Sequence, residues 1–170
     1  MSYILVAFDA STLILLAKIE LLPPVVERVT AVVTPPVALE ATRQRARWDA
    51  RAVRALIESR RITVRKAEPA LTHRLAEDFR LEAGEASTLA LAKTQGGIMA
   101  TDDGVAIKAC KAVEVPFVTA LHVLLEMAER RMVDRAMALA KLEQLQKVGR
   151  YHPRILEGAM ASLMKGGHAS

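Results

Sequence analysis

The stretch Tyr3-Ile-Leu-Val-Ala-Phe-Asp9-Ala-Ser-Thr-Leu-Ile-Leu-Leu-Ala-Lys18 decides the class of fold. The run from Tyr3 to Phe8 is almost wholly apolar, which is typical of a strand buried on both faces of a sheet. Thr12 to Lys18 has the pattern of a helix. An acidic residue, Asp9, separates the two elements. The order strand, acid, helix is therefore established at the start of the chain.

The same alternation continues along the chain. Further strands are predicted over residues 29–33, 62–64, 98–101 and 115–119, and helices over residues 35–40, 47–59, 71–81, 84–95, 105–112, 121–131, 134–148 and 153–165. Thr34 is expected to cap a helix, as is Asp134, and Gly149 is expected to end one. Strands that alternate with helices imply parallel strands with helices on both faces. We predict an α/β fold.

Composition favours one globular domain. The chain has 170 residues, of which 52% are hydrophobic and 25% charged, enough for one core and too few for two ordinary domains. The single cysteine, Cys110, permits no intrachain disulfide, which favours a reducing compartment. Asp9 interrupts the first apolar run before it reaches signal-peptide or membrane-span length. We expect a cytoplasmic protein with no membrane partner.

A basic segment extends from Arg43 to Lys66. It holds nine Arg and Lys residues against Asp49 and Glu58, in a chain of net charge +5. Such a segment fits a polyanion, because phosphates are attracted without regard to sequence. A solvated helix face is the alternative, and the segment alone leaves both open. The candidate RNA-binding residues are Arg43, Arg45, Arg47, Arg51 and Arg54.

Acidic residues follow two of the predicted strands. Asp9 ends the first, and Asp102 and Asp103 lie between a strand and Gly104. In parallel sheets functional groups collect beyond the carboxyl ends of the strands. The adjacent charges of Asp102 and Asp103 repel each other unless a cation or solvent screens them. A helix cap at Asp9 and an Asp-Gly turn at residues 102–104 are the structural alternatives.

Two glutamates complete the candidate cluster. Glu40 lies about one turn beyond Pro36, and Glu85 begins an apolar helix, where the helix dipole also favours its charge. Together the acids offer hard oxygen ligands of the kind that Mg²⁺ or Mn²⁺ prefers. The four histidines show no metal-ligand spacing. We therefore expect a site built from carboxylates alone.

Four segments resemble the PIN-domain nucleases, a family that includes the toxins of many toxin–antitoxin pairs. They are Phe8-Asp9-Ala-Ser-Thr-Leu-Ile, Thr34-Pro-Pro-Val-Ala-Leu-Glu40, Gly84-Glu85-Ala-Ser-Thr-Leu-Ala-Leu-Ala and Ala100-Thr101-Asp102-Asp103. The resemblance covers about residues 3–119, and the tail is similar to a little-studied PIN-like branch. It departs from the pattern at Glu85, where many toxins carry aspartate. It implies a three-layer α/β/α domain over residues 1–170, with a parallel sheet of four to five strands in a core of about 3–119 and a C-terminal helical extension over about 120–166.

The resemblance also implies a function, that of a metal-dependent endoribonuclease that hydrolyses RNA with Mg²⁺ or Mn²⁺. The implied catalytic residues are Asp9, Glu40, Glu85, Asp102 and Asp103. Asp9, Asp102 and Asp103 would bind metal, and the doubled acid leaves open which of the last two does so directly. Ser11, Thr101 and Thr119 would support the site by hydrogen bonding. Implied partners are RNA, an antitoxin protein and a second copy of the chain.

Two other functions compete with this interpretation. One is a catalytically weak module that binds nucleic acid or protein. The other is a small-molecule magnesium phosphohydrolase, because a strand, an aspartate and a helix also open the haloacid-dehalogenase-like phosphatases. Those enzymes carry a second aspartate two positions on, where this chain has Ser11. That difference makes the phosphatase the weaker of the two.

Overall fold

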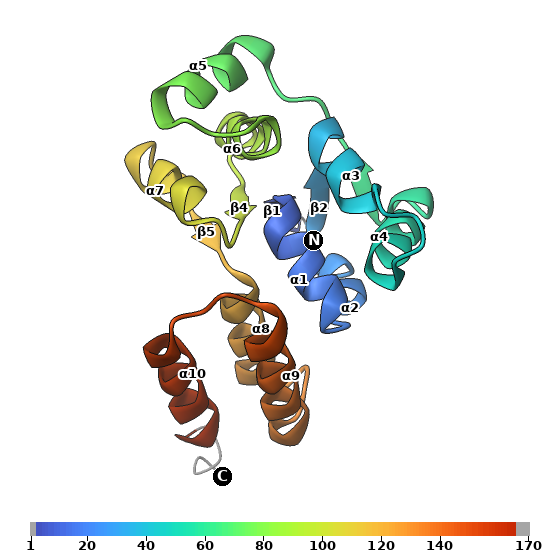
Figure 1. Ribbon diagram of the computed structural model, residues 1–170, viewed down its shortest axis with the longest axis vertical. Helices are drawn as coiled ribbons and strands as arrows, with labels where there is room; N and C mark the ends of the chain where they lie inside the picture. Colours follow the sequence, from blue (N-terminus) through green and yellow to red (C-terminus); the bar gives the residue numbers. More distant parts are fainter. Residues whose placement is uncertain (1–2, 166–170) are drawn as a thin grey trace. The chain divides into compact units, whose positions relative to one another are not determined.

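The computed structural model describes residues 3–165 (Figure 1). The chain divides into two compact units, of which the first ends at Thr119 and the second begins at Ala120. The first unit holds the whole sheet, and the second is helical. No helix over residues 3–165 combines the length and the apolar character that a membrane span requires.

The sheet has five parallel strands, which confirms the α/β prediction. They are β1 (Leu5–Phe8), β2 (Thr30–Val33), β3 (Ile62–Val64), β4 (Ile98–Ala100) and β5 (Phe117–Val118), in the order β3-β2-β1-β4-β5. Ala7 of β1 lies beside Val32 on one side and Met99 on the other. From β1 the chain continues to β2 and β3 on one side and then crosses to β4 and β5 on the other, so the carboxyl end of β1 is the switch point where open α/β sheets place their ligands.

Helices flank the sheet in two groups. The helices of this unit are α1 (Ala10–Lys18), α2 (Leu22–Val26), α3 (Pro35–Thr42), α4 (Trp48–Glu58), α5 (Pro69–Phe79), α6 (Ala83–Gln95) and α7 (Gly104–Ala112). Helices α1, α3 and α4 pack against one another, as do α5, α6 and α7, and α3 also contacts α6. The sequence predicted all of them within a few residues except the short helix α2.

Small residues let the elements of the core approach closely. Helix α6 is buried along most of its length and packs on β1. It ends at Gly96, whose φ of 65° is a left-handed conformation that glycine adopts without strain. A Cβ at Gly97 would lie 2.7 Å from the Leu5 carbonyl oxygen, so only glycine permits the start of β4 to lie directly against β1.

The residue before α3 does not act as predicted. Thr34 occupies the cap position, and Pro35 and Pro36 form the first turn as expected, but no cap hydrogen bond forms from the Thr34 side chain. Its hydroxyl lies instead 2.8 Å from that of Ser87 on α6. Both side chains are buried, and their pairing satisfies each of them. The predicted cap at Thr34 is therefore wrong.

The second unit contains α8 (Ala120–Glu129), α9 (Arg135–Val148) and α10 (Pro153–Lys165), as the periodicity predicted. Asp134 caps α9, because its Oδ1 accepts from the Met137 N–H at 2.7 Å. Gly149 follows the last turn of that helix. Helix α9 packs against both α8 and α10.

Candidate active site

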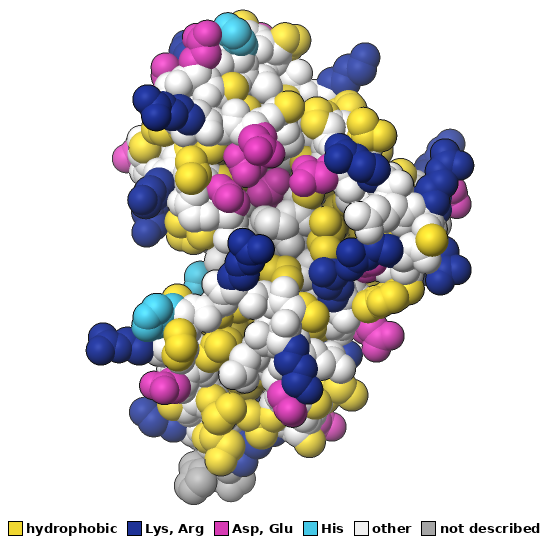
Figure 2. Space-filling model, in the orientation of Figure 1, with side chains coloured by type: hydrophobic (Ala, Val, Ile, Leu, Met, Phe, Trp, Pro, Cys, Tyr) yellow, Lys and Arg dark blue, Asp and Glu magenta, His cyan; other side chains and the backbone are white. Residues whose placement is uncertain are grey.

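Five acidic side chains line one cavity of about 240 Å³ beyond the carboxyl ends of the strands. Figure 2 shows acidic side chains gathered on this face of the first unit. The lining residues are Asp9, Ala10, Ser11, Ile14, Glu40, Glu82, Gly84, Glu85 and Asp103. None of these described residues is basic. The cavity therefore concentrates negative charge with no protein cation inside it.

Asp9 is the most enclosed of the acids, with 4% of its surface exposed. It stands between β1 and α1 as the cap of that helix, where Oδ1 accepts from the Ala10 N–H at 2.8 Å. Oδ2 accepts from the hydroxyls of Thr101 at 2.8 Å and Ser11 at 3.1 Å. Asp9 therefore caps α1, as the structural alternative predicted, and it also lines the acidic cavity.

The hydroxyls of Ser11 and Thr101 connect Asp9 to the end of β4. Ser11 Oγ accepts from the Asp102 N–H at 3.0 Å, and Thr101 Oγ1 accepts from the Asp103 N–H at 3.2 Å. Each hydroxyl therefore donates to Asp9 and accepts from the neighbouring loop, which holds the two acidic segments in register. Thr119, predicted to do similar work, is not among the described residues that line the cavity.

The two adjacent aspartates point in different directions. Asp103 lines the cavity and caps α7, where its Oδ2 accepts from the Ala106 N–H at 2.8 Å. Asp102 is not among the lining residues, and its Oδ2 accepts from the Thr12 hydroxyl at 2.5 Å. The structure thus brings together Asp9 and Asp103 and places the Asp102 carboxylate beside α1.

The start of α6 contributes two acids to the cavity, Glu82 at the cap position and Glu85 in the first turn. Glu85 Oε2 accepts from the Glu82 backbone N–H at 3.0 Å, the reach-back of a capping box. Glu82 itself was not predicted as a site residue. One signal in the sequence could have identified it: Glu82 lies three residues before Glu85, which is the spacing of a capping box.

Glu40 reaches the cavity because α3 and α6 lie close together. A Cβ at Gly84 would lie 3.4 Å from Val37 Cγ2 and 3.5 Å from Glu40 Oε2. These are ordinary contact distances, and they show that the Glu40 carboxylate lies directly beside the start of α6. The carboxylate from α3 joins those from the ends of β1 and β4 in this way.

Burial and crowding raise the pKa of two of the acids. Desolvation raises the pKa of Asp9, opposed by its hydrogen bonds with Thr101, Ala10 and Ser11, and the charge of Glu40 raises it further. Burial likewise raises the pKa of Glu85 from 4.5 to about 7. The hydrogen bond from the Glu82 N–H opposes this rise, and the negative charges of Asp103, Asp9 and Glu82 add to it. The cluster therefore resists full ionisation when no cation is near.

The donor set suits a hard divalent cation, because every ligand it offers is oxygen. Over residues 3–165, however, no three acidic, histidine or cysteine side chains are already close enough to hold one ion. The carboxylates of Asp9, Glu85 and Asp103 bond to the starts of three helices in this arrangement. Coordination of an ion would require these side chains to shift within the cavity.

The five candidate RNA-binding arginines differ in their surroundings. Arg47 Nε donates to the buried Asp49 carboxylate at 3.1 Å, and Arg54 Nη2 donates to the Thr42 carbonyl at 3.0 Å. These two side chains fasten the loop between α3 and α4. The remaining three, which we name the arginine trio, are exposed: Arg43, Arg45 and Arg51.

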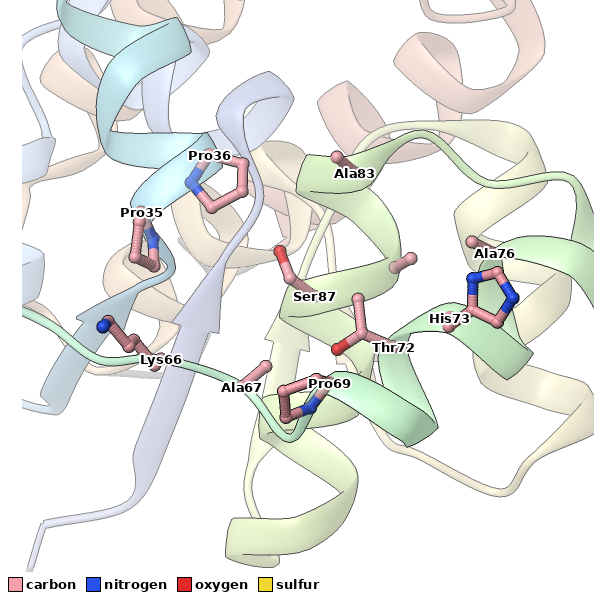
Figure 3. Close-up of a pocket in the computed structure, with 11 residues that line it drawn as sticks. Pro35, Pro36, Lys66, Ala67, Pro69, Thr72, His73, Ala76, Ala83 and Ser87 are labelled. Atoms are coloured by element: carbon pink, nitrogen blue, oxygen red, sulfur yellow. The ribbon is translucent and has the colours of Figure 1, made fainter.

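A second cavity of about 560 Å³ is lined by residues of α3, α5 and α6 and of the segment before α5 (Figure 3). Its lining is mainly proline and alanine. The polar groups of Ser87, Thr72 and His73 already have partners within the chain, which are Thr34, Glu68 and Glu77. Lys66 also lines this cavity, but none of the described carboxylates does, so of these two cavities only the smaller is lined by acidic side chains.

Comparisons with known proteins support the fold and the family. The model of the family DUF3368, described as a PIN domain, matches residues 5–165. The crystal structure of PAE2754 from Pyrobaculum aerophilum is similar with a TM-score of 0.54 and 20% sequence identity, over 75% of this chain and 98% of that chain. At that identity the likeness shows the fold alone. No curated protein matches the chain.

The family match spans nearly the whole chain and so includes all the residues that line the acidic cavity. PIN domains are generally nucleases, they bind nucleic acid, and they typically use divalent metals. The fold, the switch-point acids and the family match agree with one another. This chain belongs to the PIN-domain family.

Proposed function

We propose that the chain is a divalent-metal-dependent endoribonuclease that hydrolyses phosphodiester bonds of RNA with Mg²⁺ or Mn²⁺. The observation that carries this proposal is the cavity at the switch point, which five carboxylates line without a basic side chain. The carboxylates in such a cavity repel one another, and a bound cation offsets that repulsion. A divalent ion held there would polarise the phosphate and lower the pKa of a water molecule.

The residues of the chain would divide the work as follows. Asp9 would be the central ligand, because it is buried and three donors fix the orientation of its carboxylate. Asp103, Glu40 and Glu85 would complete the ligand set or orient its waters. Asp103 is favoured over Asp102 as the direct ligand, since only Asp103 lines the cavity. Ser11 and Thr101 would act as positioning residues through Asp9.

RNA is the proposed substrate because of the arginine trio beside α3, the helix that carries Glu40. These side chains would contact phosphates and give affinity with little choice of sequence. The lone, buried Cys110 supports a reducing compartment, and we infer the cytoplasm. The role of a toxin with an antitoxin partner, and a homodimer, are proposed on the family resemblance alone.

A metal titration tests the proposal. Labelled single-stranded RNA is incubated with the protein and increasing Mg²⁺ or Mn²⁺, beside the variant Asp9→Asn. We expect cleavage that requires the metal and is lost in the variant. Asp134→Asn is the matched control, because Asp134 also caps a helix but does not line the cavity. Metal-independent cleavage, or full activity in Asp9→Asn, would overturn the proposal.

One observation favours a second candidate, a PIN-domain module that binds RNA without cutting it. Among the described residues, no three acidic, histidine or cysteine side chains lie close enough together to hold a metal ion. Under that alternative RNA would bind to the parent protein, and neither Mg²⁺ nor Mn²⁺ would produce cleavage at any concentration. The titration above therefore separates the two candidates directly.

A further inference from the structure

The only tryptophan of the chain is about half exposed. Trp48 is the first residue of α4, and 48% of its surface is exposed. The residues that α4 buries are Asp49, Ala50, Val53 and Leu56. About half of the surface of the largest side chain of the molecule is therefore left outside the core. A large aromatic ring held at the surface is a common feature of binding sites.

The surroundings of Trp48 are strongly basic. Arg45 precedes it in the loop, and Arg51 lies three residues on, which places it next to Trp48 on the helix surface. The nearest acid in the sequence, Asp49, is buried and paired with Arg47. Lys and Arg side chains lie over α3 and α4 in Figure 2. This surface, which we call the corner, thus combines the aromatic ring of Trp48 with the exposed guanidinium groups of Arg43, Arg45 and Arg51.

The corner is also fixed in place. Arg47 is bonded to Asp49 on α4, and Arg54 reaches back from α4 to the Thr42 carbonyl at the end of α3. Helix α4 packs against both α1 and α3. Because the loop is tied at both ends, little conformational entropy remains to be lost when a ligand binds Trp48.

The corner lies within reach of the acidic cavity. Glu40 lines that cavity from α3, and Arg43 is three residues further along the same helix end. Trp48 lies five positions after Arg43, a separation of at most about 18 Å when the chain is fully extended. A single strand with one phosphate at the cavity would therefore pass the arginine trio and reach Trp48 within a few nucleotides.

We propose that Trp48 and the arginine trio form a stacking platform for a base of single-stranded RNA, a few nucleotides from the bond that is cut. This inference rests on the proposed function. Every base has a π-face that can stack on an indole ring, while the guanidinium groups attract the flanking phosphates. Tryptophan and arginine also mark protein interfaces. The exposed positive charge, with the adjacent Asp49 buried and paired with Arg47, favours RNA over a protein partner.

Trp48 itself supplies the first measurement, because all tryptophan fluorescence of the protein comes from this residue. The protein is titrated in chelator, so that nothing is cut, with single-stranded RNA, with a duplex containing the same sequence, and with inorganic polyphosphate. We expect saturable quenching by the single strand and little change with the other two, which offer no free base face. Equal quenching by polyphosphate or by the duplex would overturn the platform.

Substitutions supply the second measurement, through the anisotropy of labelled RNA in chelator. Trp48→Ala should weaken binding by about 5- to 150-fold, and Trp48→Phe should keep most of the affinity. Leu39→Ala is the control, because Leu39 is 66% exposed on the neighbouring helix α3 and its loss removes only apolar surface. Unchanged binding in Trp48→Ala, or an equal loss in Leu39→Ala, would refute the proposal.

The two proposals fail in different ways. If Trp48→Ala binds RNA as the parent does while the parent still cuts RNA with Mn²⁺, the platform is wrong and the nuclease stands. If RNA quenches Trp48 and the parent never cuts, the nuclease is wrong and the platform remains as an RNA-binding site. If the parent neither binds nor cuts RNA, both are overturned.

Discussion

Replacing Glu85 with Gln should stabilise the metal-free protein at alkaline pH. Glutamine keeps an oxygen that can accept the Glu82 N–H, so the helix start survives, and only the charge is removed. Burial, with the charges of Asp103, Asp9 and Glu82, raises the pKa of Glu85 from 4.5 to about 7. That shift corresponds to about 3 kcal/mol between the two protonation states. Partial exposure of the side chain reduces it to about 1–2 kcal/mol.

The effect depends on pH in a defined direction. Because the pKa in the folded protein lies above 4.5, the stability that comes from holding this proton is fully present below about pH 4.5. It is lost as pH rises through about 7. In chelator, Glu85→Gln should therefore melt close to the parent at pH 5 and about 2–8 °C above it at pH 8.

Thermal melts from pH 5 to pH 8 measure this directly. Glu68→Gln is the control, since Glu68 also caps a helix but does not line the acidic cavity. Adding millimolar Mn²⁺ should stabilise the parent more than Glu85→Gln, because the ion binds the folded cavity. A Glu85→Gln protein that is less stable than the parent at pH 8, or a difference independent of pH, would refute the reasoning.

Three further predictions concern other parts of the structure. Asp103→Asn should lower kcat/KM and the melting shift caused by Mn²⁺ far more than Asp102→Asn, because only Asp103 lines the cavity; equal losses would contradict this assignment. Replacing the arginine trio with alanine should weaken RNA binding equally for different sequences and reduce its salt slope by about 2, measured by anisotropy at several salt concentrations; an unchanged slope would mark an ordinary solvated surface. Gly97→Ala should cost about 1–3 kcal/mol in denaturant unfolding, because its Cβ meets Leu5, whereas Gly104→Ala meets nothing within 4 Å and should be nearly neutral.

Strands and most helices could be predicted because their signals are local. Apolar runs such as the one before Asp9, and glycines such as Gly96, determine where an element begins or ends without help from distant residues. Helix α2 has no such signal. It has only five residues, two of them prolines, and the burial of Leu22, Val25 and Val26 holds it in place. Its existence depends on packing and not on periodicity.

The parts of the site that the sequence did not indicate depend on long-range contacts. The hydroxyl of Thr34 pairs with Ser87, 53 residues away, instead of capping its own helix. The choice between Asp102 and Asp103 depends on Thr12, which lies 90 residues from Asp102 in the sequence and donates a hydrogen bond to its carboxylate. Local pattern could place an acidic pair after β4 but could not orient its two carboxylates.

Three acids of the cavity also begin helices, and the two roles tolerate different replacements over evolutionary time. A helix start accepts serine, threonine or asparagine in place of aspartate, whereas a cation site needs the negative charge. In relatives that have lost the need for a cation, positions 9 and 103 should therefore drift towards Ser, Thr or Asn and seldom towards large apolar residues. A family alignment with that pattern would distinguish lineages that kept the chemistry from lineages that kept only the scaffold.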